Sequence, residues 1–184
     1  MRTVEWAPVR APAVLPPFGA AFEVHLAAYR NPAVRETSAA AWELLYQVLR
    51  KHALPTGTVV FGEHGKPYFP DGGVFFSISH AGDLVAVSVA DTPTGVDVER
   101  CDRTIRPRLI ERCLSEREKQ AFDGDFLRLW CRKESIVKLT GEGLYGYPDQ
   151  IESDDGRYDI CESIVTHNEV PYRLTAAFAK TDMK

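Results

Sequence analysis

The sequence of 184 residues has little of what several classes of protein require. Its cysteines, at positions 101, 113, 131 and 161, include no CxxC pair and no cluster with histidine. This scatter excludes the common zinc sites, and we expect four free, buried thiols. Lys and Arg number 22 against 26 Asp and Glu, a formal net charge of −4. The chain therefore lacks the basic excess of a dedicated nucleic-acid-binding protein.

Long apolar runs are also missing, and none reaches the length that spans a bilayer. Four prolines near the N-terminus interrupt any hydrophobic region of a signal peptide. They are Pro8, Pro12, Pro16 and Pro17. We therefore expect a cytoplasmic protein with no membrane and no nucleic-acid partner. The length suits one sizeable core or two closely packed subdomains.

The order of predicted elements indicates an α+β protein. In the first half we predict a strand at 3–6, a short helix before position 29, a long helix from Pro32, and strands at 58–61, 68–69, 74–79 and 84–90. In the second half we predict a strand from Val96, helices at 105–113, 116–122 and 126–140, and strands at 160–165 and 172–179. Helices followed by strands occur twice. We therefore predict two similar halves, 1–94 and 95–184, that meet near Gly95.

Local signals mark the helix ends of the second half. Ser115 and Glu118 have the spacing of a capping box. Asp125 is a candidate N-cap for the helix 126–140, and Gly141 follows its last residue, as helix C-termini prefer. These boundaries predict which side chains share a helix face.

The segment GVDVE contains two carboxylates two residues apart, Asp97 and Glu99. Side chains alternate along a strand, so both would point the same way while Val96 and Val98 point into a core. Mg²⁺ is commonly held by one or two carboxylates together with phosphate oxygens. The alternative is a solvated strand face, which has the same pattern without a ligand.

The helix 126–140 carries Glu134 and Lys138 at the edge of its apolar stripe. One interpretation is a surface ion pair between positions i and i+4, which contributes little to stability. The other is functional, because a half-buried carboxylate can act as a base or a metal ligand. Lys138 would then stabilise negative charge on a phosphate.

Three further polar residues lie upstream of the two carboxylates. Ser79 and His80 lie at a predicted strand end beside Gly82, and Lys66 lies in a Gly-Lys-Pro turn. Each alone is ambiguous, because loop histidines and lysines are usually solvated. Together with the carboxylates downstream they would fit a metal-bound pyrophosphate.

Four blocks of the sequence, taken together, resemble the motifs of the 4′-phosphopantetheinyl transferases, and most closely the monomeric surfactin-type branch. They are GKP at 65–67, FSISH at 76–80, GVDVE at 95–99, and WCRKESIVK at 130–138 followed by GEGL at 141–144. The resemblance implies a pseudo-dimer of two α/β halves, each with helices packed on an antiparallel sheet, and an active site in the cleft between them. The first 55 residues match poorly.

The resemblance also implies a role for each site residue. Asp97, Glu99 and Glu134 would hold Mg²⁺, for which Mn²⁺ could substitute. Lys66, Ser79 and His80, in the half 1–94, would contact the phosphates of coenzyme A. Glu134 and Lys138, in the half 95–184, would be catalytic, Glu134 as the general base. Arg30 and Arg35 are guesses for further contacts to the nucleotide.

The implied reaction moves the phosphopantetheine arm of coenzyme A to a serine of an apo acyl or peptidyl carrier protein. We predict that the carrier docks on residues 100–119, which contain seven basic and four acidic residues. The alternatives are a paralogue that binds coenzyme A or the carrier without chemistry, and a metal-dependent phosphohydrolase. We predict a monomer, because the chain is long enough to supply both halves of a cleft.

Overall fold

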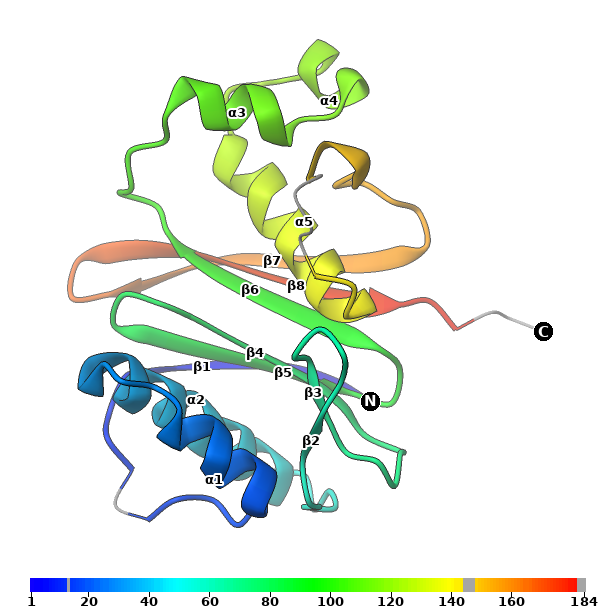
Figure 1. The fold of residues 1–184 in the computed structure, drawn as a ribbon. Coiled ribbons are helices and arrows are strands. Elements are labelled where there is room, and N and C mark those ends of the chain that lie inside the picture. The colour runs from blue at the N-terminus through cyan, green and yellow to red at the C-terminus, as the bar shows by residue number, and fades with distance from the viewer. Residues whose placement is uncertain (13, 144–147, 182–184) are drawn as a thin grey trace.

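Two three-stranded antiparallel sheets form the centre of the protein (Figure 1). In this computed structural model, which describes residues 1–12, 14–143 and 148–181, the first sheet has the order β1 (Arg2–Pro8), β5 (Leu84–Ala90), β4 (Phe75–Ala81). The second has the order β6 (Thr94–Arg100), β8 (Val170–Ala179), β7 (Tyr158–His167). In each half the first strand pairs with the last, so the two sheets share one strand order. The predicted α+β class is confirmed.

Helices cover the sheets on opposite sides, with α1 (Ala20–Ala27) and α2 (Pro32–Lys51) on the first and α5 (Phe126–Thr140) on the second (Figure 1). The remaining elements are short. They are β2 (Val60–Phe61), β3 (Pro67–Tyr68), α3 (Pro107–Cys113), α4 (Glu116–Gln120) and the 3₁₀ turn η1 (Pro148–Gln150). Strand β2 is shorter than the predicted 58–61, because only two of its residues pair across the hairpin, and β3 lies one residue before the predicted 68–69.

Strand β5 is buried on both faces and joins the two halves. Its Val85, Val87 and Val89 pack in the core beneath α1 and α2, beside Trp42. Its Leu84, Ala86 and Ala90 face the other way, into a second core with residues of β6 and β8. Burying each large apolar side chain contributes about 1.5–3 kcal/mol. One strand, apolar except at Ser88, therefore fixes the two sheets against each other.

Serine hydroxyls join the facing edges of the two sheets. The Val96 N–H donates to Ser77 Oγ at 3.1 Å, and the Val98 N–H donates to Ser79 Oγ at 3.3 Å. The two serines are two residues apart on β4, and the two valines are two residues apart on β6. Because side chains on one face of a strand recur every two residues, each hydroxyl of β4 meets one N–H at the edge of β6. Edge groups that would otherwise be buried without partners are thereby satisfied.

Helix α5 crosses β6 at Gly95. A Cβ atom at this glycine would lie 1.9 Å from the carbonyl oxygen of Ser135 and 2.4 Å from the backbone nitrogen of Leu139. The helix begins and ends where predicted, since Asp125 accepts the N–H of Arg128 and Gly141 has φ +77° at the C-cap. This close approach brings the polar edge of α5 beside the acidic residues of β6.

A buried ion pair anchors α5 to α4. Lys133 is 1% exposed and pairs with Glu118 at 2.5 Å. Burial alone would raise the pKa of Glu118, but hydrogen bonds from Lys133, Ser115 and Ser153 lower it. Glu118 also completes the predicted capping box with Ser115, which is confirmed.

The cysteines are free, as predicted, but they are not all buried. Cys113 and Cys131 are buried, Cys101 is half-buried and Cys161 is exposed. The prediction for Cys161 was wrong because β7 is an edge strand, and this position lies on its solvent face. None of the helices among the described residues is long and apolar enough to cross a membrane.

Candidate active site

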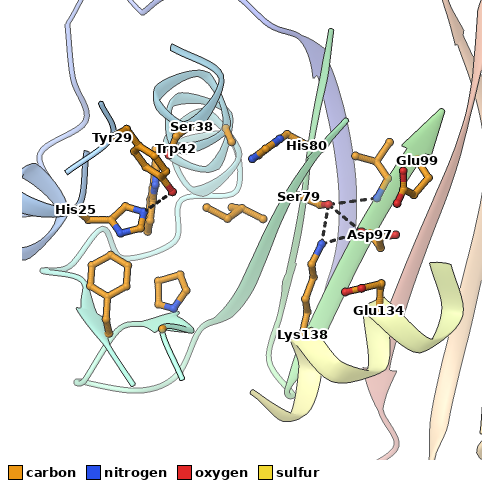
Figure 2. Close-up of a pocket in the computed structure, with 16 residues that line it drawn as sticks. His25, Tyr29, Ser38, Trp42, Ser79, His80, Asp97, Glu99, Glu134 and Lys138 are labelled. Atoms are coloured by element: carbon orange, nitrogen blue, oxygen red, sulfur yellow. Dashed lines mark hydrogen bonds and ion pairs between the residues drawn. The ribbon is translucent and has the colours of Figure 1, made fainter. Parts of the chain in front are cut away.

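A cavity of about 410 Å³ is lined by residues of both halves (Figure 2). Six of the predicted site residues line it: Ser79, His80, Asp97, Glu99, Glu134 and Lys138. They come from β4, β6 and α5, which are adjacent because of the serine contacts and the helix crossing at Gly95. The structure therefore brings together groups that lie up to 59 residues apart in the sequence.

Lys138 is the centre of a polar network in this cavity (Figure 2). Its Nζ donates to Asp97 Oδ1 at 2.8 Å and to Ser79 Oγ at 2.8 Å. Ser79 in turn donates to Asp97 Oδ1 at 3.1 Å. The ion pairs among the described residues join Lys138 to Asp97 and not to Glu134. The interpretation of Glu134 and Lys138 as a surface ion pair is therefore wrong, because Lys138 reaches across to the neighbouring strand.

Glu134 is half-buried beside these groups. Burial raises its pKa to about 7; Lys138 opposes this shift, while Asp97 and Glu99 add to it. The carboxyl group is therefore able to exchange a proton near neutral pH, as a general base must.

Glu99 is held through a single oxygen. Its Oε1 accepts from Trp130 Nε1 at 3.1 Å and pairs with Arg103 at 2.6 Å. Trp130 lies one helical turn before Glu134. One face of α5 therefore orients Glu99, through Trp130, and carries Glu134. Sequence analysis did not assign these roles to Trp130 and Arg103.

The carboxylates fit a hard divalent cation by their chemistry. Asp97 is buried, and its Oδ2 has no hydrogen-bond partner among the described residues. Asp97 and Glu99 also raise the pKa of Glu134, because like charges gather there. A bound cation would relieve this excess of negative charge. Over residues 1–12, 14–143 and 148–181, however, no ready group of three or more such donors is found. The donors line one cavity, but they do not form a ready set of three in this structure.

His80 is exposed, and its ring points from β4 toward α2, away from the network of Lys138, Asp97 and Ser79 (Figure 2). Burial of the ring lowers its pKa, Lys138 lowers it further, and Asp97 opposes them. A neutral imidazole can donate one hydrogen bond and accept another. His80 is therefore placed to contact a ligand without adding a full charge.

Lys66 lies in an adjoining cavity of about 220 Å³, which shares Gly65, Pro67, Ile78 and Lys138 with the first. Its Nζ donates to the carbonyl oxygens of Leu139 at 2.6 Å and Thr94 at 3.3 Å. Burial lowers its pKa to about 8. In this structure Lys66 caps the C-terminal end of α5, and its predicted phosphate contact stays a prediction. Leu144, the last residue of the GEGL block, lies outside the described residues.

The wall contributed by the first half is aromatic. His25 stacks on Phe61 with ring centroids 4.6 Å apart, and its Nε2 lies 3.2 Å from the Tyr29 hydroxyl. Trp42 completes the wall, fully buried, with an Nε1 that has no partner among the described residues. Sequence analysis missed this wall, although the i,i+4 spacing of His25 and Tyr29 predicts a shared face. Arg30 and Arg35 do not line the cavity, and Arg35 faces a separate groove beside α1.

Comparison with known proteins gives consistent matches. Residues 93–177 match the model of the 4′-phosphopantetheinyl transferase superfamily. The chain is 35% identical over 134 residues to the 4′-phosphopantetheinyl transferase AcpT of Escherichia coli O157:H7, a match that covers 64% of this chain and 65% of that protein. It is 36% identical over 121 residues to psf-1 of Bacillus pumilus, covering 56% of this chain and 52% of that protein. It is 33% identical over 131 residues to ffp of Bacillus subtilis, covering 65% and 54%. Both are also named 4′-phosphopantetheinyl transferases. The chain thus matches between about half and just under two thirds of the length of these relatives.

Proposed function

The chain belongs to the 4′-phosphopantetheinyl transferase superfamily, and from this premise we propose that it transfers the 4′-phosphopantetheine arm of coenzyme A to a serine of an apo carrier protein. The products are the holo-carrier and adenosine 3′,5′-bisphosphate. The observation that carries the proposal is the network of Lys138, Asp97 and Ser79, with Glu134 beside it, in one cavity between the two sheets.

The residues have distinct roles in the proposed reaction. The serine oxygen of the carrier forms a bond to the β-phosphorus of coenzyme A, and the bond from that phosphorus to the bridging oxygen breaks. Glu134 accepts the serine proton, directly or through water, because its pKa of about 7 suits proton exchange at neutral pH. Lys138 stabilises the negative charge that collects on the departing bisphosphate. Positioning and charge neutralisation dominate in such phosphoryl transfers.

Asp97, Glu99 and Glu134 would hold Mg²⁺, or Mn²⁺ in its place. When bound, the cation neutralises charge on the pyrophosphate oxygens. The orphaned Oδ2 of Asp97 and the raised pKa of Glu134 support this assignment. Ser79 holds Asp97 in its orientation. The phosphates are contacted by His80 and Lys66, and by Ser79 once its hydroxyl hydrogen turns from Asp97 to a phosphate oxygen.

We propose that the two halves form a pseudo-dimer, in which residues 1–94 supply the contacts to the phosphates of coenzyme A and residues 95–184 the metal ligands and catalytic groups. The identical strand order of the two sheets supports it. The cleft between them would be the active site of a monomer in the surfactin-type branch. The compartment we propose is the cytoplasm.

The carrier is proposed to dock on residues 100–119, directly after the metal ligands of β6. Arg106, Arg108 and Arg112 are exposed, and none belongs to an ion pair among the described residues. Such a positive patch would raise the encounter rate with an acidic carrier and fix its orientation.

Two other functions remain as alternatives. A non-catalytic binder of coenzyme A or of the carrier would have no need of three neighbouring carboxylates, one of which, Asp97, has a buried oxygen without a hydrogen-bond partner among the described residues. A metal-dependent phosphohydrolase would release phosphopantetheine to water in the absence of any carrier.

One experiment separates the three. The protein is incubated with coenzyme A, Mg²⁺ and an apo-carrier, and the carrier is weighed by mass spectrometry. A gain of one phosphopantetheine arm, lost in Asp97→Ala, is the expected result. An unchanged carrier with intact coenzyme A would indicate a binding protein, and hydrolysed coenzyme A a phosphohydrolase.

A further inference from the structure

The two carboxylates of β6 are each paired with a basic side chain of the protein itself. Asp97 pairs with Lys138 at 2.8 Å, and both residues line the cavity. Glu99 pairs with Arg103 at 2.6 Å, and Arg103 makes no other ion pair among the described residues. Arg103 does not itself line the cavity. It therefore reaches the carboxylate from the protein surface.

Arg103 belongs to residues 100–119, the proposed docking segment for the carrier. It lies in the loop between β6 and α3, which carries the chain from the second sheet to the N-terminal end of α5 (Figure 1). Its side chain is 39% exposed, whereas that of Glu99 is 20% exposed. The guanidinium group thus lies at the boundary between the proposed metal site and the proposed docking surface.

A second contact links the same carboxylate to the docking segment. Trp130 donates to Glu99 Oε1 at 3.1 Å, and this is the oxygen that pairs with Arg103. Trp130 packs on an apolar cluster formed by α3 and α5, and Ile105 of the loop packs on the same cluster. The loop is therefore anchored on both sides of Arg103, by β6 and by Ile105. This anchoring keeps the guanidinium group within reach of Glu99.

A divalent cation and Arg103 would compete for Glu99. A cation held by this carboxylate repels the guanidinium group, which lies 2.6 Å from Oε1. Solvent screens the pair, because Arg103 is exposed, so the pair contributes only a modest free energy. Binding of a divalent cation is therefore sufficient to open it. Arg103 then adds its positive charge to the docking segment, beside the exposed Arg106.

We propose that Arg103 couples the metal site to carrier docking. Without the cation, Glu99 holds Arg103. With the cation bound, Arg103 is free to pair with an acidic side chain of the carrier. The inference rests on the proposed function and concerns its regulation. Because coupling between two sites is reciprocal, the docked carrier should also favour binding of the cation.

The first test measures the cation alone. Binding of Mn²⁺ to the protein, without coenzyme A or carrier, is followed by the electron paramagnetic resonance signal of free Mn²⁺. Arg103→Ala should bind Mn²⁺ about two- to fivefold more tightly than the unmodified protein, which is the range that an exposed ion pair contributes. Arg103 is exposed, so the variant should keep the fold, and urea denaturation verifies this.

The matched control is Arg117→Ala. Arg117 is another exposed arginine of the docking segment, and it pairs with Asp154 outside the cavity. This variant loses the same charge and one exposed ion pair, so its affinity for Mn²⁺ should equal that of the unmodified protein. Equal affinities in Arg103→Ala and Arg117→Ala would overturn the inference. Absence of Mn²⁺ binding in every form would overturn it too.

The second test measures docking without reaction. A carrier that the protein modifies is prepared with alanine in place of its acceptor serine, and its dissociation constant is measured by calorimetry with and without Mn²⁺. Mn²⁺ should tighten docking about two- to fivefold in the unmodified protein and in Arg117→Ala. It should have no effect in Arg103→Ala. The same Mn²⁺ effect in all three proteins would mean that Arg103 carries no coupling.

Failure of the inference is distinguishable from failure of the proposed function. If the unmodified protein transfers phosphopantetheine but Arg103→Ala has an unchanged affinity for Mn²⁺, the coupling is disproved and the proposed function stands. If no apo-carrier is modified in the presence of coenzyme A and Mg²⁺, the proposed function is disproved, together with the coupling that rests on it.

Discussion

The Ser79 hydroxyl uses its whole hydrogen-bonding capacity on the contacts that orient Asp97. It donates to Asp97 Oδ1 at 3.1 Å and accepts from the Val98 N–H at 3.3 Å and from Lys138 at 2.8 Å. A hydroxyl has one donor and two acceptor sites. One serine of β4 therefore ties together the edge of β6, a proposed metal ligand and the proposed phosphate-binding lysine.

We expect Ser79→Ala to weaken both folding and turnover. The buried Val98 N–H would lose its partner, which costs about 1–3 kcal/mol, and Asp97 would lose its orientation. The matched control is Ser77→Ala, which removes the same contact from Val96 one register away. Urea denaturation should show similar destabilisation in both variants, whereas kcat should fall only in Ser79→Ala. Equal kcat values in the two variants would contradict the role of Ser79 in the site.

Glu134→Gln should keep the fold and lose the reaction. The amide is nearly isosteric but cannot accept the serine proton, so turnover should fall by about 10²–10⁴-fold. Binding of coenzyme A, measured by calorimetry, should change little. Glu36→Gln, an exposed change on α2, is the control. Unchanged turnover in Glu134→Gln would remove Glu134 from the mechanism.

Lys66 predicts a pH dependence for the affinity of coenzyme A. Its pKa of about 8, lowered by burial, means that it is charged below about pH 8 and loses its charge as the pH rises through that value. If Lys66 contacts the phosphates, the KM for coenzyme A should rise between about pH 7.5 and about pH 9.5. Lys66→Arg keeps its charge over this range, so its KM profile should be flat. Parallel profiles for the two proteins would exclude Lys66 from phosphate binding.

Removal of one partner from the buried Lys133–Glu118 pair should be strongly destabilising. Lys133→Met leaves a buried carboxylate without its cation, which typically costs about 3–5 kcal/mol. The double variant Glu118→Gln with Lys133→Met should recover part of this loss, because no unpaired charge remains. Lys119→Met breaks the exposed pair with Glu116 and should cost less than about 1 kcal/mol. Urea midpoints at equal m-values test all three, and equal losses in Lys133→Met and Lys119→Met would disprove the anchoring role.

Charge reversal on α3 tests the docking surface. Arg106→Glu combined with Arg112→Glu should raise the KM for the carrier and leave that for coenzyme A unchanged. Added salt should weaken the unmodified protein more than this variant. The control is Arg10→Glu combined with Arg35→Glu, which changes the net charge by the same amount but on the first half. It should leave the KM for the carrier unaltered. If both double variants respond alike, the carrier docks elsewhere.

The sequence by itself determined the local structure and the motif residues. Strand β5 and helix α5 have the predicted bounds, because an apolar run interrupted by Ser88 alone, an Asp125 cap and Gly141 are signals within a few residues. The alternation along β6 also placed Asp97 and Glu99 on one side, and both line the cavity.

Only the tertiary structure decided which groups meet. Lys138 pairs with Asp97 rather than with Glu134, four residues away on its own helix, and Lys66 donates to the end of α5. The aromatic wall of His25 and Phe61, and the exposure of Cys161, were likewise invisible in the sequence. The physical reason is that a side chain takes the best partner within reach in space. That partner depends on how the sheets and helices pack, which no local pattern of residues encodes.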